Sequence, residues 1–169
     1  MNNLSCGLLL DYSRSNRIIV KVLMVCLGNI CRSPIAHGIL QNRIEQKGLA
    51  WEVDSAGTSG WHDGEMPDRR SIEVAKNYDI DISRQKSRKF VVSDFDTYDH
   101  IIAMDASNYN NIRALARDDS DKSKVSMLLN YLYPGENRQV PDPYYEGGFD
   151  VVFQMIEKSV DKMIDSISS

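Results

Sequence analysis

The sequence contains little cysteine, and its few cysteines do not suggest a disulfide framework. Only 3 of its 169 residues are cysteine, Cys6, Cys26 and Cys31, an odd number without the spacing of a secreted disulfide-rich domain. Cys26 and Cys31 do not have the two-residue spacing of a common zinc motif, and no second Cys or His pair follows at zinc-ligand spacing. We therefore expect reduced thiols, no metal site and no cofactor.

Long apolar runs and clusters of positive charge are also absent. No segment reaches the length that crosses a bilayer, and the apolar patch at residues 8–10 is too short, and too close to Asp11, for a signal peptide. The formal net charge of -4 argues against a broad positive surface for nucleic acid. We therefore expect a cytoplasmic protein that binds neither membranes nor nucleic acid.

The length of the chain favours a single domain. With 169 residues, 42% of them hydrophobic, the protein can bury one sizeable core but is too short for two ordinary domains. Residues 1–17 show no clear periodicity, which predicts a loosely held N-terminal extension. We expect residues 18–169 to form the single domain and the protein to be a monomer.

Apolar runs alternate with helical patterns from residue 18 onward. The runs at residues 18–25, 51–55, 99–104 and 125–129 predict strands. Helices are predicted from Ser33, as N-cap before Pro34, to Gly48, over residues 69–79, through Ile112 and Leu115, and over residues 149–167. This alternation is typical of an α/β fold with a parallel sheet covered on both faces, in which ligands bind at the carboxyl ends of the strands.

The loop after the first predicted strand has a composition suited to binding phosphate. Gly28 permits backbone conformations that turn successive amide N–H groups inward, and the following helix presents its positive end. The same field favours the thiolate form of Cys26, to which the Ser33 hydroxyl can donate. The predicted phosphate-binding loop consists of Leu27, Gly28, Asn29, Ile30, Cys31, Arg32 and Ser33.

Arg32 and a distant aspartate complete a set of catalytic candidates. The planar guanidinium of Arg32 can bind two equatorial oxygens of a phosphoryl group, a geometry that lysine does not reproduce. Phosphoryl transfer depends mainly on positioning and electrostatics, which the loop and Arg32 supply without a metal. The leaving group also needs a proton, and Asp142, held rigidly before Pro143, can supply it. The predicted catalytic residues are therefore Cys26, Arg32 and Asp142.

The run from Cys26 to Pro34 and the distal Asp142-Pro143-Tyr144-Tyr145 resemble the low-molecular-weight protein tyrosine phosphatases. The resemblance covers nearly the whole chain after Ile18. It implies an α/β fold of the phosphotyrosine protein phosphatase I-like type, a doubly wound four-stranded parallel sheet flanked by helices. Four further stretches match this family: Ser55-Ala56-Gly57-Thr58, Trp61-His62, Ala103-Met104-Asp105 and Ser107-Asn108.

The resemblance implies a role for each matching catalytic residue. Cys26 would attack phosphorus and form a phosphocysteine, Arg32 would bind the phosphoryl oxygens, and Asp142 would protonate the leaving group and then activate water. Cys31 would protect an oxidised Cys26 through a reversible disulfide. The enzyme would thus be a protein-tyrosine phosphatase acting on phosphotyrosine-containing proteins and small aryl phosphates.

Further residues are implied for the pocket and for support of the loop. Trp61, Tyr144 and Tyr145 would line a deep aromatic slot, which favours phosphotyrosine over the shorter phosphoserine. Asn29, Ser33 and Ser55 would hold the loop in shape. One departure concerns residues 82–85, where many family members carry a histidine that supports the loop asparagine and this chain has Arg84-Gln85.

Several candidates also have a purely structural interpretation. Asp142 before a proline is typical of a turn, Trp61 can cap the core, and Cys31 can be a packing residue. The three histidines, His37, His62 and His100, are scattered singly, as surface or packing histidines are.

Three alternative functions remain to be compared. An arsenate reductase of the same fold would need further cysteines for its thiol relay, and none follows Cys31. A protein arginine phosphatase would, by resemblance, carry threonine at the position of Ile30. A non-catalytic phosphate or phosphopeptide binder would need neither the thiolate nor the distal acid.

Overall fold

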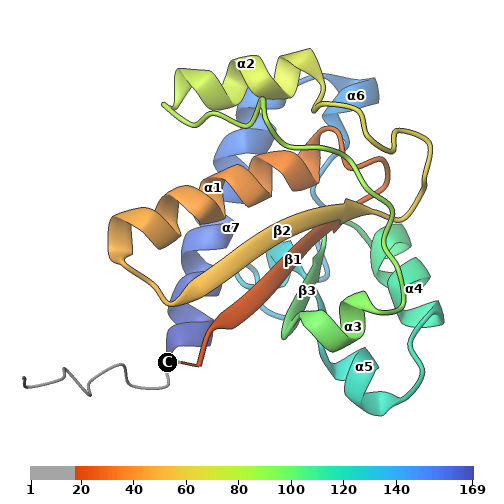
Figure 1. The fold of residues 1–169 in the computed structure, drawn as a ribbon. Coiled ribbons are helices and arrows are strands. Elements are labelled where there is room, and N and C mark those ends of the chain that lie inside the picture. Colours follow the sequence, from red (N-terminus) through yellow and green to blue (C-terminus); the bar gives the residue numbers. More distant parts are fainter. Residues whose placement is uncertain (1–17) are drawn as a thin grey trace, which may run out of the picture.

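The computed structural model describes residues 18–169, so the predicted extension at residues 1–17, with Cys6, lies outside the described residues. Four parallel strands form the central sheet (Figure 1). They are β1 (Val20–Cys26), β2 (Trp51–Gly57), β3 (His100–Ala103) and β4 (Val125–Met127), in the order β2-β1-β3-β4. The predicted four-stranded parallel sheet is confirmed.

Helices cover both faces of the sheet (Figure 1). On one face lie α1 (Arg32–Lys47), α2 (Arg69–Asn77) and α7 (Phe149–Ser168), and on the other α3 (Asp94–Thr97), α4 (Ala106–Ala114) and α5 (Asp119–Ser123). A short 3-10 helix, η1 (Leu128–Asn130), follows β4, and α6 (Pro143–Glu146) precedes α7. Among residues 18–169, no helix combines the length and the apolar character needed to cross a membrane.

The central strand β1 explains why its sequence is almost continuously apolar. Val22 and Met24 pack into the core under α1, α2 and α7, whereas Leu23 and Val25 pack into the core on the opposite face. All four side chains are fully buried. A parallel strand with helices on both faces has no solvent side, so every position favours an apolar residue.

Several predicted element boundaries differ from the observed ones by one or two residues. Helix α1 begins at Arg32 with Cys31 as its N-cap, so Ser33 lies inside the first turn rather than capping it. Strand β4 ends at Met127, because Leu128 already belongs to η1. The C-terminal end of α1 agrees with the prediction, since Gly48 adopts the left-handed conformation (φ 61°) that commonly terminates helices.

Three short helices were not predicted. The apolar periodicity that reveals long helices has no room to develop in four or five residues, and α3, α5 and α6 are that short. In α5 and α6, an aspartate at the N-cap accepts a hydrogen bond from the first turn: Asp118 from Asp121 N–H and Asp142 from Tyr144 N–H. Capping side chains therefore contribute to the formation of these two helices.

Candidate active site

The candidate site lies where β1 ends and α1 begins. β1 pairs with β2 on one side and β3 on the other, so the loop after it lies at the carboxyl edge of the sheet, next to the point where the strand order reverses. The loop closes within a few residues, between Cys26 at the end of β1 and Arg32 at the start of α1. The fold thus places both predicted catalytic groups at one edge.

The conformation of the loop depends on Asn29 rather than on Gly28. Asn29 has a φ of 55°, in the left-handed region that asparagine tolerates better than most residues, whereas Gly28 is not among the residues with positive φ. Gly28 instead leaves room for the side chain of His62, whose Cδ2 would lie 3.1 Å from a Cβ atom at this position. The predicted conformational role of Gly28 is therefore corrected to a packing role.

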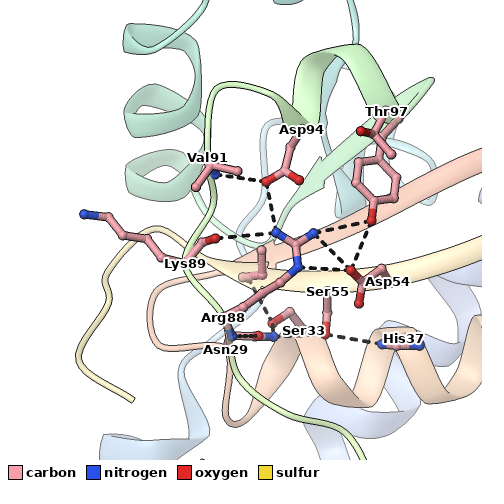
Figure 2. A network of polar contacts seen from close by, with 12 residues as sticks. Asn29, Ser33, His37, Asp54, Ser55, Arg88, Lys89, Val91, Asp94 and Thr97 are labelled. Atoms are coloured by element: carbon pink, nitrogen blue, oxygen red, sulfur yellow. Dashed lines mark hydrogen bonds and ion pairs between the residues drawn. The ribbon is translucent and has the colours of Figure 1, made fainter. Parts of the chain in front are cut away.

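Side-chain hydrogen bonds hold Asn29 in this conformation (Figure 2). Its Nδ2 donates to Oγ of Ser33 at 2.8 Å and to Oγ of Ser55 at 3.0 Å, while its Oδ1 accepts from the backbone N–H of Arg88 at 3.0 Å. The structure thus brings together the three residues expected to support the loop, and adds Arg88.

The sulfur of Cys26 contacts two residues of this network. Ser33 Oγ is 3.0 Å from Sγ of Cys26, and the backbone N–H of Asn29 donates to the same sulfur at 3.3 Å. Cys26 is only 3% exposed, yet it lines a pocket that opens to the surface. A hydroxyl group and a backbone N–H thus lie within hydrogen-bonding distance of the sulfur.

Arg32 lies in the same pocket and is surrounded by negative groups. Its Nη1 donates to Oδ2 of Asp105 at 2.7 Å and to the carbonyl of Val140 at 3.1 Å, and its Nη2 donates to Oδ2 of Asp142 at 3.1 Å. Burial would lower the pKa of Arg32, but the charges of Cys26, Asp142 and Asp105 raise it above its ordinary value. The guanidinium is therefore a fixed positive charge.

Asp142 both caps a helix and contacts Arg32 in the pocket. Its Oδ1 accepts from the backbone N–H of Tyr144 and caps α6, while its Oδ2 faces Arg32. The structural role of Asp142 is therefore to cap a helix rather than to form a turn, and the same residue also lines the pocket with Cys26. Asp142 lies at the start of α6, far from Cys26 along the chain but in the same pocket.

Aromatic side chains form the wall of the pocket. Trp61, Tyr144 and Tyr145 line it together with His62. Trp61 is 74% exposed, which contradicts the alternative in which it caps the core. His62 was not predicted as a pocket residue. Its position beside Trp61 in a glycine-rich loop was the available signal, and its Nδ1 lies 2.8 Å from Oε2 of Glu65.

A second residue that the sequence interpretation missed is Asp105. It follows β3, caps α4 by accepting from Asn108 N–H at 2.7 Å, and binds Arg32 with its other oxygen. An aspartate between a strand and a helix predicts a cap, but not its guanidinium partner. Nowhere in the described part of the chain do three His, Cys, Asp or Glu side chains gather as they would around a metal ion.

Known proteins resemble this chain in sequence and in fold. The model of the low-molecular-weight phosphotyrosine protein phosphatase family matches residues 21–169. The chain belongs to this family. YfkJ of Bacillus subtilis, a low-molecular-weight protein-tyrosine-phosphatase, is 39% identical over 150 residues, covering 88% of this chain and 96% of its own length. The low-molecular-weight phosphotyrosine protein phosphatase of Schizosaccharomyces pombe is 42% identical, covering 83% of this chain and 92% of its own.

Solved structures confirm the family fold. The crystal structure of YfkJ from Bacillus subtilis has a TM-score of 0.85 and 37% identity, covering 91% of this chain and 98% of that one. The crystal structure of a Drosophila arginine phosphatase has a TM-score of 0.82 and 32% identity, covering 89% of this chain and 99% of that one. This enzyme thus shares its fold with phosphatases of two named specificities.

The second cysteine of this phosphatase lies beside the first in the pocket wall. Cys26 and Cys31 are both free thiols within the described residues. Burial raises the pKa of Cys31 to about 12, so its thiol stays protonated at neutral pH. It is both buried and part of the pocket, so its position is compatible with packing and with redox protection.

The loop of this family member is supported without a histidine at residues 82–85. Gln85 donates its Nε2 to the carbonyl of Pro34 at 3.1 Å, which ties this segment to the first turn of α1. Asn29 receives its hydrogen bond from the backbone of Arg88, and Ser55 contacts Nδ1 of His37 at 3.3 Å. The support expected from one histidine therefore comes from three other residues.

Proposed function

We propose that this chain hydrolyses phosphotyrosine in proteins, and small aryl phosphates, with Cys26 as nucleophile. One observation carries the proposal: a thiol, a guanidinium and a carboxyl group, from Cys26, Arg32 and Asp142, line the same pocket. Asp142 lies 110 positions after Arg32, and their side chains are nevertheless 3.1 Å apart. A thiol nucleophile, a charge clamp and an acid are the groups that metal-free phosphoryl transfer requires.

The proposed reaction has two steps. The Cys26 thiolate attacks phosphorus and the bond from phosphorus to the phenol oxygen breaks, while protonated Asp142 gives its proton to that oxygen. Asp142 then takes a proton from water, whose oxygen attacks phosphorus, and the bond to sulfur breaks to release phosphate and the thiolate. In both steps Arg32 and the backbone N–H groups of the loop hold the phosphoryl oxygens.

The shape of the pocket supports an aryl substrate. The exposed rings of Trp61, Tyr144 and Tyr145 lie at its mouth, and the sulfur lies at its base. A phosphotyrosine can reach the sulfur while its ring contacts these walls, whereas phosphoserine is too short to do both. Phosphotyrosine-containing proteins are therefore the proposed partners.

The arginine phosphatase remains the nearest alternative, because a structure of that specificity has the same fold. Ile30 lines the pocket in this chain, and its apolar side chain suits an aryl ring. The two functions are separated by kcat/KM on matched phosphotyrosine and phosphoarginine peptides. We expect phosphotyrosine to be preferred, and a preference for phosphoarginine would contradict the proposal.

Arsenate reduction and simple phosphate binding have less support. No cysteine follows Cys31 to continue a thiol relay, and a binder would not need both Cys26 and Asp142 in one pocket. Turnover of arsenate with thioredoxin would favour the reductase.

The decisive experiment identifies the covalent intermediate. The enzyme is mixed with an aryl phosphate, quenched rapidly with acid, digested and analysed by mass spectrometry. We expect a phosphate adduct on the peptide that contains Cys26, and no adduct in Cys26→Ser. Full activity of Cys26→Ser, or an adduct on another residue, would contradict the mechanism.

We also propose that the enzyme is a monomer that acts in the cytoplasm. The support for the location is chemical: a thiol nucleophile with a second thiol in the same pocket functions best where thiols stay reduced. Light scattering coupled to size-exclusion chromatography tests the first statement, and localisation of the tagged full-length chain tests the second. A stable dimer or an exported protein would contradict them.

A further inference from the structure

His37 is a partly buried histidine for which the proposed reaction has no role. It lies on α1, and its Nδ1 is 3.3 Å from Oγ of Ser55 on β2 (Figure 2). Ser55 is bonded to Asn29, and Asn29 to Ser33, which contacts the sulfur of Cys26. The histidine thus stands at the end of a continuous chain of hydrogen bonds that leads to the nucleophile.

The direction of these hydrogen bonds is determined at Asn29. Because the backbone N–H of Arg88 donates to its amide oxygen, the amide nitrogen must face the two serines. The nitrogen carries two protons, and both are used, one for Ser33 and one for Ser55. Each serine oxygen is therefore an acceptor toward Asn29 and has its own proton available for another group.

The hydroxyl protons of Ser33 and Ser55 have different acceptors. Ser33 has the Cys26 sulfur at 3.0 Å and the carbonyl of Ala56 at 3.5 Å, so the sulfur is the nearer acceptor. Among residues 18–169, the acceptor placed for the Ser55 proton is Nδ1 of His37. Nδ1 accepts only when it carries no proton, which means a neutral imidazole with its hydrogen on Nε2.

The surroundings of His37 favour this neutral form. Burial lowers the pKa of the imidazole, while the Asp54 carboxylate on β2 acts in the opposite direction. That carboxylate is itself engaged, since it accepts hydrogen bonds from the side chains of Arg88 and Tyr98, both at 3.0 Å. The net effect leaves His37 below its ordinary pKa.

We infer that His37 is a positioning residue, whose unprotonated Nδ1 accepts the proton of Ser55 and so keeps Asn29 and Ser33 aligned to stabilise the Cys26 thiolate. The inference rests on the proposed function of Cys26. With Nδ1 protonated or removed, the Ser55 hydroxyl loses its acceptor and must reorient, and it then competes with the bond from Asn29. Asn29 would hold Ser33 less firmly against the sulfur.

Two substitutions at the same site test the role of the acceptor. His37→Leu removes Nδ1, whereas His37→Asn can place an amide oxygen near its position. The rate of iodoacetamide labelling at Cys26, followed by peptide mass spectrometry, reports the thiolate fraction at each pH without any substrate. For His37→Leu we expect the labelling midpoint to move up by about one pH unit and kcat/KM at pH 6 to fall about tenfold.

The controls separate positioning from folding. His37→Asn should recover most of the lost labelling and activity, and His100→Leu, which changes a histidine at the opposite end of the sheet, should leave the midpoint unchanged. Circular dichroism verifies that each variant is folded. An unchanged midpoint in folded His37→Leu, or equal losses in the two His37 variants, would overturn the inference.

A measurement on the unmodified enzyme covers the case in which His37→Leu does not fold. Nitrogen-15 NMR of the imidazole rings should show His37 neutral at pH 7 with its hydrogen on Nε2. A hydrogen on Nδ1 would overturn the inference. The labelling and NMR readouts need neither substrate nor turnover, so a failure of the proposed chemistry and a failure of the His37 role can be told apart.

Discussion

At the scale of single residues, the site is built from side chains that serve two functions at once. Asp142 caps a helix and faces the guanidinium, Asp105 caps another helix and binds the same guanidinium, and Ser33 accepts from Asn29 while lying against the sulfur. A side chain whose conformation is already determined by its structural bond loses little further entropy when it takes part in catalysis. Such residues hold the reacting groups in place at low cost.

The proposed role of Asp142 as the acid predicts a dependence on the leaving group. Asp142→Asn keeps an oxygen for the α6 cap but has no proton to donate, so kcat/KM, which reports the step in which the phenol leaves, should fall about a hundredfold or more for phenyl phosphate. The loss should be much smaller for nitrophenyl phosphate, whose leaving group needs little protonation. Steady-state kinetics on both esters checks this. Glu146→Gln, on the exposed side of α6, is the matched control, and equal losses on both esters would contradict the acid role.

The two pocket cysteines should differ in reactivity. Because burial raises the pKa of Cys31 to about 12, its thiol remains protonated as pH rises through the neutral range, and only above that value does the thiolate dominate. We therefore expect iodoacetamide at pH 7.5 to label Cys26 and leave Cys31 unmodified, as read by peptide mapping. Labelling of Cys31 at the same rate would contradict the assignment.

At the scale of elements, the site depends on a close contact between the end of β2 and the loop that follows β1. Gly57 closes β2, and its backbone N–H and carbonyl bond to the segment around Arg88 and Phe90. A Cβ atom on Gly57 would lie 2.8 Å from the carbonyl oxygen of Leu27, which is backbone and has little freedom to move. The end of β2 and the predicted phosphate-binding loop are therefore in close contact, which leaves no room for a side chain at Gly57.

Gly57→Ala should consequently damage activity more than stability. The loop must shift to admit the methyl group, and a displacement near 1 Å at a reacting group costs about a hundredfold in rate, while the strain costs about 1–3 kcal/mol. Steady-state kinetics and urea unfolding measure the two effects. Gly60→Ala is the control, because its Cβ atom would meet only the flexible side chains of Lys89 and Asp63. Normal kcat/KM in Gly57→Ala would contradict this account.

At the scale of the whole molecule, the two cores hold the sheet between layers of helices while the site lies at its edge. The core under α1, α2 and α7 includes Phe153, which is fully buried and stacks on Tyr78 with ring centroids 4.0 Å apart. Neither ring lines the active-site pocket. We therefore expect Phe153 to contribute to stability without direct contact with the site.

Phe153→Ala tests that expectation. Removing a fully buried phenyl ring leaves a cavity and should lower the free energy of unfolding by about 3–5 kcal/mol. The kcat of the folded protein at 15 °C should remain close to the unmodified value. Urea denaturation and steady-state kinetics check the two statements, with the exposed Val151→Ala as control. A proportional loss of kcat in fully folded Phe153→Ala would show that the core and the site are coupled.

The sequence by itself determined the order of the strands and long helices along the chain, and the loop that carries Cys26 and Arg32. These features depend on local properties: the apolar run of β1, the helical spacing of α1 and α7, and residues that are neighbours in the chain. Asp142 was inferred from the need of the reaction for an acid and from its place before Pro143. The resemblance to a family added the aromatic pocket residues, which no local pattern identifies. It also supplied the expectation that Asn29, Ser33 and Ser55 act together.

Only the tertiary structure decided which distant groups meet. Asp105 and Asp142 both reach Arg32, across 73 and 110 positions of sequence, and His37 reaches Ser55 across 18. The structure also shows that α1 starts at Arg32, and that Asn29 rather than Gly28 adopts the left-handed conformation. The physical reason is that a hydrogen bond depends on distance and direction in space, and these are determined when the sheet and its helices pack, not by spacing along the chain.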